Sequence, residues 1–209
     1  MEKKKIPTSV YAEVTPNPNS VKFVANRAII PFATAVEFKT MAEAKAHSGL
    51  ATELFNFPFV QSVFFSTNFV SVTKTPAMEW DLLTMQVREF IQEYLLNNEW
   101  AVESLPEEDL APEVEGQPKV AEAPGLGHAE PKTEIEGQIV QALDEYIRPA
   151  VEGDGGAIDF KSFSNGRLEV VLRGSCSGCP SSVVTLKSGI ETLMQNMIPE
   201  VKEVVAYEH

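Results

Sequence analysis

The chain has 209 residues, of which 44% are hydrophobic and 9% aromatic, and its mean hydropathy is −0.09. This composition is typical of a water-soluble globular protein, and no run approaches the ~18 apolar residues that span a bilayer. The formal net charge of −13 argues against nucleic acid as a partner, because phosphate binding needs a basic patch. The length allows one large or two small domains.

The start of the chain and its cysteine content bear on the compartment. Residues 1–7 are charged but lack an apolar core behind them, and they are not the Arg- and Ser-rich type of transit peptide. The only two cysteines, Cys176 and Cys179, are too few and too close for a secreted disulfide scaffold. We therefore expect a reducing compartment, the cytoplasm.

Residues 1–100 have the pattern of a mixed α/β domain. Apolar residues alternate with polar ones in the β-rich runs, and a Pro- and Asn-rich turn lies at residues 15–20. From Trp80 the apolar residues recur at the spacing of one helix face. The predicted elements are strands at 9–14, 21–24, 60–65 and 69–73, with a hairpin at 66–68, and helices at 42–55, interrupted by Gly49, and from 80 onward.

Residues 101–134 differ in composition from both flanks. They carry nine acidic and two basic side chains, a net charge of −7, with five prolines and no aromatic residue. Such a segment buries too little apolar surface to offset chain entropy, and its charges keep it extended. We interpret it as a flexible acidic linker between domains that move independently; the alternative is loose packing on one of them.

Residues 135–209 predict a small domain with the order α-β-β-α-β. The Asn165-Gly166 pair is a strong hairpin signal, and Pro149 with the turn at 153–156 is expected to end the first helix. The fold class is therefore α+β, with two small domains of the α/β-sandwich type. The predicted elements here are a helix at 135–147, strands at 157–163 and 167–173, a helix at 183–197 and a strand at 201–207.

The loop between that second strand and second helix carries both cysteines. Two thiolates at C-x-x-C spacing can hold one soft metal centre, and Gly174 and Gly178 allow a tight turn with amide N–H groups facing sulfur. The start of the following helix, at Pro180, adds partial positive charge. We therefore expect the loop to favour thiolate over thiol.

The number of ligands is informative. Iron–sulfur clusters and structural zinc usually need four thiolate-type ligands, and this chain has two. Either a second chain completes the set or two positions stay open, and both arrangements favour release, as in a carrier. From the residues alone, three alternatives stay open: a thiol–disulfide oxidoreductase, a dimeric Cys₄ zinc site, and a purely structural pair.

Other residues point to no further site. His47, His128 and His209 are scattered, so no metal role is expected for them, and no catalytic acid–base pair or triad emerges, so we expect no enzyme. The turn at 154–156 lacks a phosphate-loop frame and predicts only a positive φ. The phenylalanines at 55–69 are interpreted as core, with a partner surface as the alternative for some of them.

The sequence resembles a known protein family. Residues 135–209 are similar to the carboxy-terminal (Nfu) domain of NifU, and residues 1–100 resemble the Nfu/NifU amino-terminal domain. The motifs are Arg148-Pro149, Asp154-Gly155-Gly156, residues 174–182, Thr185-Leu186-Lys187, Gly189-Ile190-Glu191 and Ile198-Pro199-Glu200-Val201, with residues 15–23 and 60–65 in the amino-terminal part.

The resemblance implies a scaffold or carrier that binds a [4Fe–4S] cluster through Cys176 and Cys179, shared across a homodimer. It also implies delivery to apo iron–sulfur client proteins after loading by the assembly machinery, with no membrane partner. The family commonly has an acidic residue where this chain has Ala157, which leaves the cysteines unaffected. We further hypothesise that the amino-terminal domain recognises clients or machinery.

Overall fold

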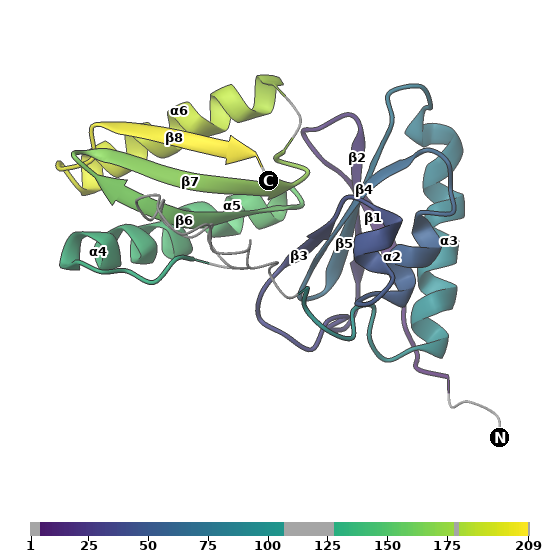
Figure 1. Cartoon of the computed structure of the whole chain (residues 1–209). Helices are drawn as coiled ribbons and strands as arrows, with labels where there is room; N and C mark the ends of the chain where they lie inside the picture. Colours follow the sequence, from purple (N-terminus) through teal and green to yellow (C-terminus); the bar gives the residue numbers. More distant parts are fainter. Residues whose placement is uncertain (1–4, 107–127, 178–179, 209) are drawn as a thin grey trace, which may run out of the picture.

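The computed structural model describes residues 5–106, 128–177 and 180–208. They form two sheets, each with its own helices and its own hydrophobic core, as expected for an α+β chain (Figure 1). The centre of the predicted linker and Cys179 lie outside this described part. Among the described helices, none combines the length and apolarity needed to cross a membrane.

The amino-terminal sheet has five antiparallel strands in the order β1-β2-β5-β4-β3. The predicted strands and the hairpin between β4 and β5 are present, and a short strand, β3, was not predicted. Three residues are too few to show an alternating pattern. The strands are β1 (Val10–Val14), β2 (Ser20–Ala25), β3 (Val36–Phe38), β4 (Val60–Ser66) and β5 (Phe69–Lys74), and the helices are α1 (Met41–Ala44), α2 (Gly49–Leu54) and α3 (Trp80–Asn97).

The helix predicted at 42–55 with an interruption at Gly49 is two helices, α1 and α2, and the break lies before Gly49, at residues 45–48. Ser48 is the N-cap of α2, and its hydroxyl oxygen accepts a hydrogen bond from the Ala51 backbone N–H at 3.0 Å. Gly49 is therefore the first residue of a new helix, and the cap satisfies one of its free N–H groups.

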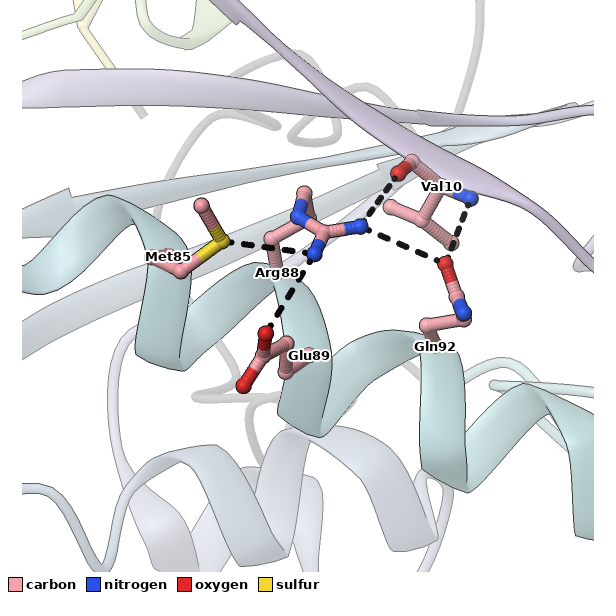
Figure 2. Close-up of polar contacts among 5 residues, drawn as sticks. All are labelled: Val10, Met85, Arg88, Glu89 and Gln92. Carbon is pink, nitrogen blue, oxygen red and sulfur yellow. Dashed lines mark hydrogen bonds and ion pairs between the residues drawn. The ribbon is translucent and has the colours of Figure 1, made fainter.

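Side chains of helix α3 supply hydrogen-bond partners for backbone groups of β1, the strand at the edge of the sheet (Figure 2). The free N–H of Val10 in edge strand β1 donates to the Gln92 side-chain oxygen at 3.2 Å. Arg88 donates to the Val10 carbonyl at 3.3 Å and to the Gln92 oxygen at 3.4 Å. Unpaired edge groups can template the addition of another strand, so these contacts block that pairing at Val10.

Both faces of the amino-terminal sheet are covered. In β5 the inward side chains of Val70 and Val72 are fully buried under the helices. Ser71, on the opposite face, is only 1% exposed, as is Phe64 of β4. In Figure 1, α2 and α3 lie on one side of this sheet and the carboxy-terminal domain lies on the other.

The carboxy-terminal sheet has three strands, with β6 and β7 antiparallel and β8 parallel to β7. Asn165 and Gly166 have φ values of 52° and 84°, so the predicted Asn-Gly hairpin has the primed geometry that suits twisted strands. The elements are α4 (Glu134–Ala142), η1 (Leu143–Ile147), α5 (Arg148–Gly153), β6 (Gly156–Ser164), β7 (Arg167–Gly174), α6 (Pro180–Met197) and β8 (Glu203–Glu208).

Of the two signals expected to end the first helix, the turn at 153–156 ends it and Pro149 does not. The chain passes from α4 through the π-helical segment η1 into α5, and Pro149 lies in the first residues of α5. The π-helical turn interrupts the regular α-helical hydrogen bonds before Pro149. Pro149 therefore lies at the start of a new helix, where a backbone N–H would have no partner within the helix and its absence costs little. The helix ends at Gly153 instead.

Both ends of the segment predicted as a linker, residues 101–134, contact the domains. Ala101 and Val102 are fully buried in the amino-terminal core, and the Ala101 N–H donates to the Ile29 carbonyl at 2.7 Å. At the other end the Ala129 N–H donates to the Phe160 carbonyl of β6 at 2.8 Å. These backbone hydrogen bonds join the segment's two ends to the domains, which composition alone did not reveal.

Candidate metal-binding loop

The loop that carries Cys176 begins where β7 ends. Gly174 has a φ of +67°, a conformation that L side chains rarely adopt. A Cβ on Gly174 would also lie 2.9 Å from Phe64 Cγ and 2.8 Å from the Gly155 carbonyl oxygen. Both the backbone angle and the crowding therefore require glycine at the entrance to the loop. Ser175 and Cys176 then form a turn that leads toward α6.

Cys176 is buried, with 6% of its surface exposed, and belongs to the hydrophobic core of the carboxy-terminal domain. Its sulfur lies against the first residue of β6, because a Cβ built on Gly156 would be 2.8 Å from Cys176 Sγ. The β6–β7 register pairs Gly156 with Gly174 and so places the turn at 154–156 beside the loop.

The turn at 154–156 also leaves space beside the Cys176 sulfur, a role that the sequence did not predict. The predicted positive φ is confirmed at Gly155, where it is +81°. The closeness of Gly156 to the sulfur was not predicted, because only strand pairing brings residues 20 positions apart together. The Asp154-Gly155-Gly156 motif is the sequence signal for this turn. Glycine is needed at 155 because of the positive φ, and at 156 because a side chain would collide with the Cys176 sulfur.

The prediction that the loop favours thiolate is wrong for this conformation. Burial raises the pKa of the Cys176 thiol to about 11, and the Asp154 carboxylate adds to the rise while a hydrogen bond from Ser175 opposes it. A thiol with this pKa is protonated at neutral pH.

The backbone explains why. The expected anion nest requires amide N–H groups aimed at sulfur, but three of them have other acceptors. The Ser175 N–H donates to the Gly155 carbonyl at 3.3 Å and the Ser177 N–H to the Gly174 carbonyl at 3.1 Å. The Gly174 N–H donates to the Glu37 carboxylate at 3.2 Å. These three N–H groups therefore do not contribute positive potential at the Cys176 sulfur.

The amino-terminal domain contacts the same loop. Asn17 Nδ2 donates to the carbonyls of Ser175, at 3.1 Å, and of Ser177, at 3.4 Å, so it binds on both sides of Cys176. The sequence predicts only a turn at Asn17, and Asn17 has that role too, since its Oδ1 accepts from the Asn19 N–H at 3.0 Å. The contact to the loop joins residues 158 positions apart, beyond the reach of local patterns.

The described histidines have other partners. His47 Nδ1 lies 2.8 Å from Ser104 Oγ. His128 accepts the Phe160 backbone N–H at 2.7 Å and lies 2.9 Å from Asp144. Within residues 5–106, 128–177 and 180–208, no three His, Cys, Asp or Glu side chains converge as a metal-ligand set. Cys179 and His209 fall outside those residues.

Comparison with known proteins assigns the chain to a family. Residues 10–98 match the family model described as scaffold protein Nfu/NifU N terminal, and residues 139–205 match the NifU-like domain. The chain is similar to the human NFU1 iron-sulfur cluster scaffold homolog, mitochondrial, at 36% identity over 93% of this chain and 70% of that protein.

Two further relatives extend the match. A NifU-like protein of Schizosaccharomyces pombe is 32% identical over 94% of this chain and 71% of its own length. NifU-like protein 4, mitochondrial, of Arabidopsis thaliana is 32% identical over 93% of this chain and 64% of its own length.

The names of these relatives contradict the predicted cytoplasmic location, because the human and Arabidopsis proteins are both named as mitochondrial. The low cysteine content indicates a reducing compartment, and it does not distinguish the cytoplasm from other reducing compartments. The two family matches and the relatives agree with the motifs around residues 15–23, 154–156 and 174–182. The chain therefore belongs to the Nfu/NifU family of iron–sulfur cluster scaffold proteins.

Proposed function

We propose that this chain is a carrier that binds a [4Fe–4S] cluster through Cys176 and Cys179 of two protomers and delivers it to apo-proteins. The observation that supports this proposal best is the number of cysteines. The chain has two in total, whereas a cluster usually needs four thiolate-type ligands. The scaffold names of its relatives support the same role. A second copy of the chain is the simplest source of the missing pair.

The proposed carrier holds its cargo reversibly. A cluster shared between two chains leaves when the chains separate, and an apo-protein that offers a full cysteine set competes for it. The thiol–disulfide oxidoreductase alternative is less well supported, because the C-x-x-C loop follows the β6–β7 hairpin and not the βαβ unit that carries a thioredoxin-like site.

Anaerobic reconstitution with iron and sulfide tests this function. We expect a brown dimer with four iron and four sulfide per two chains, by metal and sulfide analysis together with size measurement. Cys176→Ser or Cys179→Ser should abolish the colour, because either change leaves two thiolates per dimer. Ser177→Ala, in the same loop, is the control and should keep the cluster.

Transfer is tested by mixing the loaded dimer with an apo [4Fe–4S] enzyme and following the recovery of that enzyme's activity. Recovery should outpace that from free iron and sulfide in the presence of a chelator. A colourless monomer that catalyses disulfide exchange would replace the carrier by the oxidoreductase.

A further inference from the structure

One face of the amino-terminal sheet is turned away from α2 and α3, and we call it the outward face (Figure 1). It is unusual because it carries large apolar side chains. Antiparallel sheets commonly leave one face to solvent, and that face is then polar. Here Val24, Phe64 and Phe69 lie on it and form a buried cluster with Ala157 of the other domain. If the domains were apart, the two phenylalanine rings would be exposed together. The face therefore has the composition of a binding surface, and in this structure its occupant is the chain's own carboxy-terminal domain.

Polar contacts surround this apolar cluster, and nearly all of them bind the backbone of the two segments that enclose Cys176. Asn17 binds the carbonyls on either side of Cys176, as described above. Ser71 Oγ donates to the Gly155 carbonyl at 2.7 Å, and Lys22 Nζ donates to the Gly153 carbonyl at 3.3 Å. The face is thus matched to the shape of the loop and of the turn at 153–156.

A carboxylate of the amino-terminal domain also binds the loop. Glu37 of β3 accepts the Gly174 N–H at 3.2 Å, and burial raises the pKa of its carboxyl against this hydrogen bond and the attraction of Lys39 and Arg173. Arg173 belongs to the other domain and lies 3.3 Å from Asp159, and both side chains are almost fully buried. The amino-terminal domain therefore contacts the loop at Gly174 as well as on both sides of Cys176.

We propose that the outward face of the amino-terminal sheet is an intramolecular cap on the Cys176 loop, and that the domains separate before the loop binds a cluster or a second chain. The proposal rests on the proposed function for the identity of the cargo. In the capped state Cys176 is only 6% exposed, and its neighbours on both sides are held by Asn17. A ligand loop occupied in this way cannot also face the same loop of another protomer.

Asn17→Asp is the sharpest test. The aspartate keeps an oxygen for the Asn19 N–H, so the turn is preserved, but it replaces a donor by a carboxylate aimed at two carbonyl oxygens. Asn19→Asp is the matched control. It makes the same charge change two residues away, where the side-chain oxygen already accepts from Lys74 Nζ of the same domain at 3.3 Å.

The readouts use the apo full-length chain. In a Cys179→Ser background Cys176 is the sole thiol, so its rate of maleimide modification reports the cap. We expect Asn17→Asp to react about tenfold faster than Asn19→Asp and the parent, corresponding to ~1.4 kcal/mol of lost docking. A nearby carboxylate alone would raise the thiol pKa and slow the reaction, so faster modification identifies opening. Small-angle scattering should show a larger radius of gyration only for Asn17→Asp.

Equal modification rates and equal radii for the parent and both variants would overturn the cap. Ser71→Glu provides a second, independent opening variant, because Ser71 is on the outward face and a longer charged side chain there fits only if the domains part. Protection of Cys176 that is lost on dilution would assign the contact to a second chain and also overturn it. None of these measurements requires a cluster, so they stand even if reconstitution fails.

Discussion

Gly156 shows how one missing side chain shapes the site. Its Cβ would lie 2.6 Å from the Arg173 carbonyl oxygen and 2.8 Å from Cys176 Sγ, distances at which a neighbour must move. Arg173 and Cys176 flank the entrance to the loop, so any displacement there moves the sulfur. Gly137, in α4, is the opposite case, because nothing lies within 4 Å of a Cβ at that position.

We expect Gly156→Ala to destabilise the protein by about 1–3 kcal/mol, as overpacking does, and to lower the iron bound on reconstitution. Gly137→Ala should instead stabilise it by about 0.5–1 kcal/mol, because alanine restricts the unfolded chain and favours helix. Urea denaturation of both variants measures the difference. Equal stability of the two would show that the turn tolerates a side chain beside the sulfur.

Among the elements, the start of α4 is determined by local chemistry. Thr133 Oγ1 accepts the Glu136 N–H at 3.2 Å, and a Glu136 carboxylate oxygen accepts the Thr133 N–H at 3.0 Å. This reciprocal capping box satisfies backbone groups that a helix start leaves free. It also sets where the predicted linker gives way to the carboxy-terminal domain.

Thr133→Ala should cost about 1 kcal/mol of unfolding free energy, because the N-cap acceptor is lost. Thr133→Ser keeps the hydroxyl and should restore most of that stability. The comparison is made by thermal or urea unfolding of the full chain. A serine variant as unstable as the alanine variant would mean that the threonine methyl group, and not the cap, carries the effect.

For the whole molecule, Glu37 connects domain docking to pH. Burial between the domains raises the pKa of its carboxyl, against the hydrogen bond from Gly174 and the attraction of Lys39 and Arg173. With a raised pKa in the docked state, the ionised form disfavours docking. Docking is therefore strongest below the ordinary glutamate pKa of about 4.3 and weakens as pH rises through the raised value.

Glu37→Gln should remove this dependence, because the amide stays neutral and its oxygen can still accept the Gly174 N–H. Scattering between about pH 4.5 and 8 should show the parent expanding as pH rises while Glu37→Gln keeps one radius of gyration. Glu89→Gln, an exposed carboxylate on α3, is the control and should behave like the parent. Identical profiles for Glu37→Gln and the parent would assign any expansion to other groups.

The sequence by itself determined the elements whose signals are local. Alternation predicted the described strands except β3, helical spacing predicted α3 and α6, and Asn165-Gly166 predicted its hairpin. These signals act over a few residues, as side-chain periodicity and turn chemistry do. It also showed that the chain has two cysteines, half the number of thiolate-type ligands that a cluster usually needs.

Only the tertiary structure decided the state of the loop. Pairing of Gly156 with Gly174 and the contacts from Asn17 and Glu37 bury Cys176 and use the amide groups that were expected to face its sulfur. These contacts join residues 18 to 158 positions apart, and no local pattern encodes them. The pKa of a thiol depends on what surrounds it in space, so the same loop that predicted a thiolate holds a buried thiol while the domains are docked.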